Sequence, residues 1–277
     1  MVPKSAWQRS FITFAISFSL VAINVITDLS FYLLAVPVVI LVGMSKGGFG
    51  GGLGTLAVPF LSLLIDPRLA AAILLPILCG MDAVSLWSFR GTWDKLNLKI
   101  LMPGAILGTI AGALTFNMTN ADMVRLIVGV LSIYFVGHYL WGKHFLESLQ
   151  QQKASPVRGS FWGAVAGYVS YIAHAGGPPV AIYLLPQHLP KTTLVGTTIL
   201  FFAIINFIKL IPYAWLGQIN TESFLTSLVL LPLAPLGVQL GIYLHNRVSD
   251  QVFYWVSYGF LLLAGIKLTY EGAAALL

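Results

Sequence analysis

The sequence predicts an all-α, polytopic integral membrane protein of about 10 or 11 helical segments. Two inverted repeats of five segments each account for these helices, with broken or re-entrant short helices after glycine-rich stretches. Composition is the first observation behind this prediction, since 58% of the 277 residues are hydrophobic and only 9% are charged. In soluble proteins roughly a quarter of the residues are charged. An internal repeat and two glycine-rich interruptions are the other observations.

Apolar segments bounded by charges, prolines and polar clusters define the predicted helices. They lie at 11–27, 30–46, 52–65, 69–89, 98–117, 122–141, 160–173, 178–189, 192–216, 223–245 and 250–271. Most approach the roughly 20 residues that cross a bilayer, whereas 52–65 and 178–189 are short. The basic residues ahead of the first segment are typical of a signal peptide, but further spans follow directly, so we expect a retained helix.

These segments divide the chain into four parts. Residues 1–28 are predicted to be an N-terminal transmembrane helix, 29–141 the first repeat, 142–159 a cytoplasmic linker and 160–277 the second repeat. No polar stretch is longer than the linker, which excludes a separate catalytic or nucleotide-binding domain.

The two halves of the chain share a pattern with a repeat unit of about 125 residues. Matching elements at one constant offset are Leu101-Met102-Pro103 with Leu230-Leu231-Pro232, Gly108 with Gly237, and Gly112 with Gly241. Because each unit has an odd number of segments, the second copy should be inverted in the membrane.

Basic residues predict the orientation of the chain in the cell inner (cytoplasmic) membrane. With a cytoplasmic N-terminus, nearly all of them fall on the cytoplasmic side, whereas Arg68 and the turn at 217–222 lie outside. We therefore interpret the net charge of +6 as an orientation signal and expect the lipid bilayer, not nucleic acid, as the partner.

Two interruptions of the apolar pattern are the most informative motifs. Residues 47–54 contain six glycines directly after Lys46, and the second break is Tyr171-Ile172-Ala173-His174-Ala175-Gly176-Gly177-Pro178-Pro179. A helix that breaks in hydrocarbon must be buried in protein or line a cavity. Paired breaks in two half-repeats are typical of the substrate site of a transporter.

The short helices after the breaks are expected to begin near Gly52 and Pro178, and helix starts bind anions. Glycines also permit tight helix packing. Six glycines in eight residues exceed what packing needs, which favours a binding role.

The candidate substrate-binding residues lie at the two breaks and on one later helix. They are Ser45, Lys46, Gly51, Gly52, Ser170, His174, Gly176, Gly177, Pro178, Asn206 and Lys209. Each polar side chain also has a structural interpretation. Lys46 could snorkel to the cytoplasm, the serines could cap their own helices, and His174 could be satisfied by a neighbouring carbonyl.

Asp82 is the candidate residue for ion coupling, because charges inside a membrane are costly and usually functional. It aligns loosely with Asn206 in the other repeat, so both are expected to face one cavity. An Asp82–Lys209 ion pair that only holds the bundle together is the structural alternative.

The chain is not predicted to be an enzyme or to carry a cofactor or metal. Its single cysteine, Cys79, excludes an internal disulfide and any multi-cysteine metal site. Ser170 and His174 suggest an intramembrane hydrolase as an alternative of another class, but no Gly-x-Ser-x-Gly elbow is present. A sensor or assembly factor is a further alternative.

The glycine-rich first break, the Gly-Gly-Pro-Pro element followed by Val180-Ala181-Ile182-Tyr183-Leu184, and the Asn206 helix together resemble the sulfite exporter TauE/SafE family. The resemblance covers roughly residues 30 to 271. It implies a secondary transporter of sulfite, thiosulfate, sulfonates or sulfoacetate, coupled to H+ or Na+. The residues that match the family pattern are Gly51, Gly52, Pro59, Gly176, Gly177, Pro178, Pro179 and Asn206.

We expect the anion to lie at the membrane midplane between two opposed helix starts, with Lys46 or Lys209 neutralising part of its charge. Rocking of the inverted repeats would then give alternating access. A passive anion channel and a transporter of a non-sulfur organic anion are the alternatives.

Overall fold

Helices build the whole of the structure, a computed structural model that describes residues 25–50, 54–55, 57–116, 118, 120–145 and 152–276. The region predicted as the first repeat contains α2 (Leu29–Gly48), α3 (Ala57–Leu61), α4 (Pro67–Ser88), α5 (Lys95–Thr115) and α6 (Ala121–Phe145). The second contains α7 (Pro156–Ala173), α8 (Gly177–Leu184), the 3-10 helix η2 (Leu185–Gln187), α9 (Lys191–Trp215), α10 (Thr221–Leu230), α11 (Leu233–Arg247) and α12 (Asp250–Leu276). The predicted all-α fold is confirmed.

Five described helices are long and apolar enough to cross a membrane: α2, α4 from Arg68, α5, α9, and α12 from Trp255. Helices α10 and α11 would form a sixth span, bent by 46°. The segment predicted at 223–245 thus consists of two helices that meet at a bend. Pro232 and Pro235 explain the bend, because neither can donate a backbone hydrogen bond within a helix.

Some predictions fall outside the described residues. Most of the predicted N-terminal helix lies in residues 1–24, and the linker at 142–159 includes residues 146–151. Gly51 and Gly52 also lie outside the described part of the chain.

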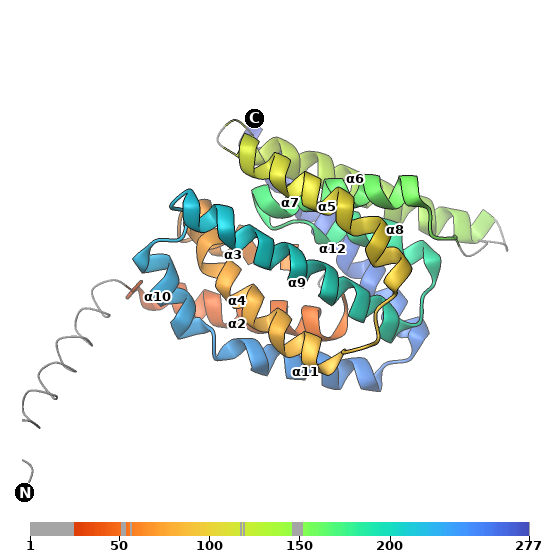
Figure 1. The fold of residues 1–277 in the computed structure, drawn as a ribbon, viewed down its shortest axis with the longest axis horizontal. Helices are drawn as coiled ribbons and strands as arrows, with labels where there is room; N and C mark the ends of the chain where they lie inside the picture. Colours follow the sequence, from red (N-terminus) through yellow and green to blue (C-terminus); the bar gives the residue numbers. More distant parts are fainter. Residues whose placement is uncertain are drawn as a thin grey trace, which may run out of the picture.

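Equivalent helices of the two halves make equivalent contacts. Helix α2 packs along α11, and its counterpart α7 packs along α5, the counterpart of α11 (Figure 1). The two remaining long pairs, α4 with α9 and α6 with α12, each join a helix to its own counterpart. Exchanging the halves therefore reproduces the packing scheme.

Matched glycines make these close contacts possible. A Cβ added at Gly108 would lie 2.0 Å from the carbonyl oxygen of Ala164, and one at Gly237 would lie 2.7 Å from that of Ile40. Gly112 and Gly241, the next matched pair, likewise face the carbonyl oxygens of Tyr168 and Met44. Glycine at these positions lets the backbones of α5 and α7, and of α2 and α11, approach directly.

Part of the first glycine run has the same packing role. A Cβ at Gly47 would lie 2.3 Å from the oxygen of Val238, and one at Gly48 would lie 2.4 Å from that of Gly241. The expectation that the glycines 47–54 serve mainly for binding is therefore wrong for the first two, which pack against α11.

The first break ends α2. The Phe49 N–H bonds to the Ser45 oxygen at 2.8 Å, and Gly50 then adopts a φ of +69°. Residues 54–55 form a 3-10 turn, and α3 (Ala57–Leu61) ends four residues before the predicted end at 65. The expected start near Gly52 lies outside the described residues.

The second break matches its prediction. Helix α7 ends at Ala173, and the His174 cap has a left-handed φ of 52°. Helix α8 then begins at Gly177, directly before Pro178 and Pro179. Proline is favoured in a first helical turn because its missing donor is unpaired there in any case.

Candidate functional site

A small cavity of about 30 Å³ lies between the two breaks, with room for about two water molecules. Both repeats contribute to its wall. The lining residues are Lys46, Gly54, Thr55, Leu78, Ser170, His174, Gly177, Phe202, Asn206 and Lys209. Six of them were predicted from the sequence, on segments far apart in the chain.

Lys46, in the last turn of α2, is buried against α4. Its Nζ donates to Asp82 Oδ1 and to the Leu78 oxygen at 3.4 Å. Lys46 is 6% exposed and Asp82 is fully buried. The snorkelling alternative for Lys46 is therefore wrong, and so is the alternative of an Asp82–Lys209 ion pair, because the ion-pair partner of Asp82 is Lys46.

Asn206 binds the other oxygen of the same carboxylate. Its Nδ2 donates to Asp82 Oδ2 at 2.7 Å, which joins the two central helices α4 and α9. Asn206 lines the cavity, whereas Asp82 does not. The expectation that both face one cavity is correct for Asn206 alone, since Asp82 lies behind Lys46 and Asn206.

Lys209 lies one helical turn after Asn206 and is 1% exposed. Its Nζ donates to the oxygen of Ser170 at 3.0 Å and to Ser170 Oγ at 3.1 Å. Both acceptors are neutral, and no described carboxylate lies within ion-pair distance of this ammonium. The positive charge of Lys209 is therefore not paired inside the described cavity wall.

His174 is 7% exposed, and neither ring nitrogen makes a hydrogen bond within the described residues. The carbonyl groups of Ser170 and Ala71 lie nearby without hydrogen-bonding geometry. A carbonyl-satisfied histidine is therefore not what the structure contains. Ser170 also makes no hydrogen bond to the His174 ring, which leaves the hydrolase alternative without its required serine–histidine contact.

The start of α8 reaches the cavity through Gly177. Pro178 and Pro179 carry no N–H, and the Val180 N–H bonds to the Gly176 oxygen at 3.4 Å. This helix start therefore offers fewer backbone donors than an ordinary one, which has four. What it presents to the cavity is the positive end of the helix dipole and Gly177.

The other predicted residues lie beside the cavity. Gly176 caps α8 in a tight space, where an added Cβ would lie 2.9 Å from the Ala166 oxygen. Pro178 lines a neighbouring cavity together with Phe49 and Gly50. Ser45 is buried on α2 and does not line the central cavity.

Four lining residues were missed from the sequence: Gly54, Thr55, Leu78 and Phe202. Thr55 had a usable signal, because it is a hydroxyl residue directly after the glycine run. Leu78 and Phe202 lie within continuous apolar helices and gave none.

The chemistry of the site favours an anion. Lys46 and Lys209 carry two positive charges and Asp82 one negative charge, so the ionised cluster has one net positive charge. Within the described part of the chain, no group of three His, Cys, Asp or Glu side chains could hold a metal ion.

Comparison with known proteins gives one result. The model of the family described as sulfite exporter TauE/SafE matches residues 35–268, which include both breaks and every described lining residue of the cavity. Searches of curated proteins and of solved structures gave no match. The chain belongs to the sulfite exporter TauE/SafE family.

Proposed function

We propose that this chain moves small sulfur-containing oxyanions by alternating access and binds them in the central cavity. Family membership makes it a membrane transporter of sulfur anions in general. The proposal adds the location of the site, the residues that hold the anion and the coupled ion.

The observation that carries the proposal is that the Lys209 amino group is buried with only neutral partners among the described residues. A buried ammonium with only neutral partners is costly, because the apolar surroundings do not replace its hydration. An oxyanion in the cavity would provide the missing negative charge and would accept hydrogen bonds from Lys209 and His174. Asn206 and the start of α8 are the further groups within reach of the same space.

The small volume of the cavity supports a mechanism in which the two halves of the protein move relative to each other. About 30 Å³ cannot hold a sulfonate, which has a carbon group besides its sulfur and three oxygens. We therefore propose that the described conformation is contracted and that substrate binds when the two halves separate. Inverted repeats that rock around a central site provide such a movement.

Asp82 is the proposed coupling residue. Lys46 Nζ and Asn206 Nδ2 donate to its two oxygens, so Na+ would have to bind beside the Lys46 ammonium, a like charge. A proton on Asp82 would instead release the charge of Lys46 and give the cluster a second net positive charge. We therefore propose H+ as the coupled ion, taken up together with a dianion.

Transport by proteoliposomes tests the proposal. The wild-type chain should show saturable, proton-linked uptake of at least one of sulfite, thiosulfate and a small sulfonate. Lys209→Met should reduce this uptake about tenfold or more, because a hydrogen bond to a charged group is lost. Lys99→Met, a matched change at an exposed lysine, should leave it unchanged.

Two results would contradict the proposal. A flux that rises linearly with anion concentration would indicate a channel, and uptake restricted to carboxylates would indicate a non-sulfur substrate. Thermal stabilisation of the purified protein by the same anions gives an independent measure of binding, since a ligand of the native state raises its stability.

A further inference from the structure

A second and larger cavity, of about 200 Å³, lies apart from the central one and shares none of its lining residues. Five helices and the loop after α9 meet around it. Its lining residues are Val58, Asp66, Arg68, Ala71, Phe116, Asp122, Arg125, Ile172, Tyr213 and Gln218. Arg68, in the first turn of α4, and Gln218, in the turn after α9, lie on the side that the basic residues of the sequence predict to be outside the cell.

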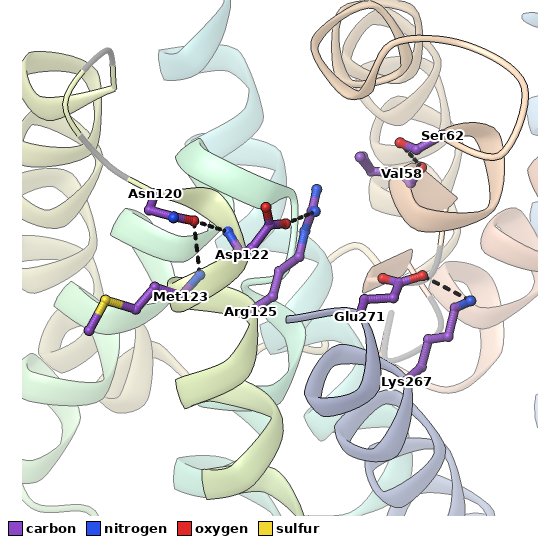
Figure 2. Close-up of polar contacts among 8 residues, drawn as sticks. All are labelled: Val58, Ser62, Asn120, Asp122, Met123, Arg125, Lys267 and Glu271. Carbon is purple, nitrogen blue, oxygen red and sulfur yellow. Dashed lines mark hydrogen bonds and ion pairs between the residues drawn. The ribbon is translucent and has the colours of Figure 1, made fainter. Parts of the chain in front are cut away.

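Arg125 forms one wall of this outer cavity. Its Nη1 binds Asp122 Oδ1 at 2.7 Å, and the Asn120 side chain accepts from the backbone N–H groups of Asp122 and Met123 (Figure 2). The Arg125 side chain is only 11% exposed, and its Nε is buried without a hydrogen-bond partner. One donor of the guanidinium therefore remains unused.

Arg68 lies at the mouth of the same cavity. Its guanidinium carbon lies 5.5 Å from the centre of the Phe116 ring, and no described carboxylate pairs with it. The neighbouring Asp66 uses Oδ1 to cap α4, accepting from the backbone N–H groups of Arg68 and Leu69. The acidic residues of the cavity are thus engaged, while both arginines keep free donors.

Tyr213 separates the outer cavity from the central one. Its side chain is 1% exposed and lines the outer cavity, while Lys209, one turn earlier on α9, lines the central cavity. The Tyr213 hydroxyl donates to the Tyr171 oxygen at 3.1 Å, and its ring centre lies 6.0 Å from that of His174. On α7, Ile172 faces the outer cavity between two residues, Ser170 and His174, that face the central one.

We propose that the outer cavity is a second binding site for small oxyanions, that Arg68 and Arg125 hold the anion there, and that Tyr213 is the barrier between this site and the central one. The role of the outer cavity as a waiting position for transported substrate rests on the function proposed above. Anion binding in the outer cavity does not depend on that function. Guanidinium groups with unused donors are well suited to sulfonate and sulfite oxygens.

The single native cysteine makes the outer site testable in the intact protein. Ala71 lines the outer cavity, so Ala71→Cys on a Cys79→Ala background places one thiol in it. Two membrane-impermeant thiol reagents of similar size and opposite charge, a sulfonatoethyl and a trimethylammonioethyl methanethiosulfonate, then probe the cavity in right-side-out vesicles. Lys95→Cys on the same background is the control, because it places the thiol at the start of α5, on the predicted cytoplasmic side.

The anionic reagent should label Ala71→Cys faster than the cationic one, because unpaired guanidinium donors of Arg68 and Arg125 attract its sulfonate, although Asp66 and Asp122 balance the formal charge of the cavity. Arg68→Gln should reduce the ratio of the two rates toward that of a free thiol, and so should Arg125→Gln. Sulfite or a small sulfonate should slow the labelling. Equal rates for both reagents, or a ratio that neither arginine affects, would overturn the outer site.

The barrier role of Tyr213 has its own test in the otherwise native chain. Cys79 packs in the same buried cluster as Tyr171 and Tyr213 and should resist both reagents. Tyr213→Ala should make Cys79 reactive from the outer side, whereas Tyr213→Phe, which keeps the ring, should not. A Cys79 that stays unreactive in Tyr213→Ala vesicles would overturn this role.

The two proposals can fail separately. Charge-selective labelling without any transport of a sulfur anion would overturn the function proposed for the central cavity and support the outer site. Transport that is sensitive to Lys209→Met but unchanged by Arg68→Gln and by labelled Ala71→Cys would support the central site and overturn the role of the outer cavity as a waiting position for substrate.

Discussion

Asp82 accepts a hydrogen bond from Asn206 across 124 positions of sequence, at 2.7 Å, and this bond joins the two predicted repeats. Lys46 binds the second oxygen of the same carboxylate. One buried carboxylate thus joins α2, α4 and α9 at the centre of the molecule. Any movement of one repeat against the other has to change the hydrogen bonds of this group or carry all three helices together.

Loss of the Asp82 charge is expected to destabilise the protein. Asp82→Leu would leave the Lys46 ammonium buried without its carboxylate, and breaking a buried pair costs about 3–5 kcal/mol. Thermal unfolding of the purified protein in detergent measures this change.

The double variant Lys46→Met with Asp82→Leu provides the control. Because both charges are then absent, stability should return most of the way to that of the native chain, while proton-coupled transport stays lost. Equal stability of Asp82→Leu and the native protein would contradict the importance of this ion pair.

Packing of α5 on α7 should depend on glycine at position 108. Gly108→Ala would place a Cβ 2.0 Å from the backbone oxygen of Ala164, which cannot move away as a side chain can. We expect a loss of about 3 kcal/mol, at the upper end of the range for overpacked sites. Denaturation in detergent provides the measurement.

Gly259→Ala is the matched control, because nothing lies within 4 Å of a Cβ added on that exposed side of α12. Alanine is favoured over glycine inside a helix, so this variant should be at least as stable as the native protein. If Gly108→Ala and Gly259→Ala were equally stable, the close approach of α5 and α7 would be wrong.

The sequence predicted the helical class, the two breaks and most of the residues around the central cavity. Hydropathy and glycine runs identify these features because each is encoded locally. Six of the eleven predicted binding residues line the cavity, and the start of α8 is placed to within one residue.

Pairing of the charges was not predictable in the same way. Whether Asp82 meets Lys46 or Lys209 depends on the rotation of α2 and α9 about their axes against α4, which no local pattern records. The packing role of Gly47 and Gly48 was also missed, because a glycine run has the same composition whether it binds a ligand or packs against another helix.

A buried amide pair should hold the end of α8 in place. Asn97 Nδ2 donates to Gln187 Oε1 at 2.9 Å, and Gln187 Nε2 donates to Asn97 Oδ1 at 3.1 Å. Asn97→Leu removes both bonds and leaves polar atoms of Gln187 without this partner, which costs about 1–3 kcal/mol. Unfolding in detergent should show the loss, and the double variant with Gln187→Leu should recover part of it. A neutral Asn97→Leu would show that η2 is held by other contacts.

His174 allows the side-chain role to be separated from the backbone role, because its φ of 52° is left-handed. Asparagine tolerates this backbone conformation better than most residues, so His174→Asn should fold with stability close to that of the native chain. Its shorter amide cannot reach as far into the cavity as the imidazole, and it carries no titratable proton. We therefore expect the anion to bind about tenfold more weakly, as the loss of one hydrogen bond to a charged ligand requires. Titration of thermal stabilisation with sulfite or a sulfonate gives both quantities in one experiment. Unchanged anion affinity in a folded His174→Asn protein would show that the imidazole does not bind the anion. Lys209 would then be the main cationic group of the binding site.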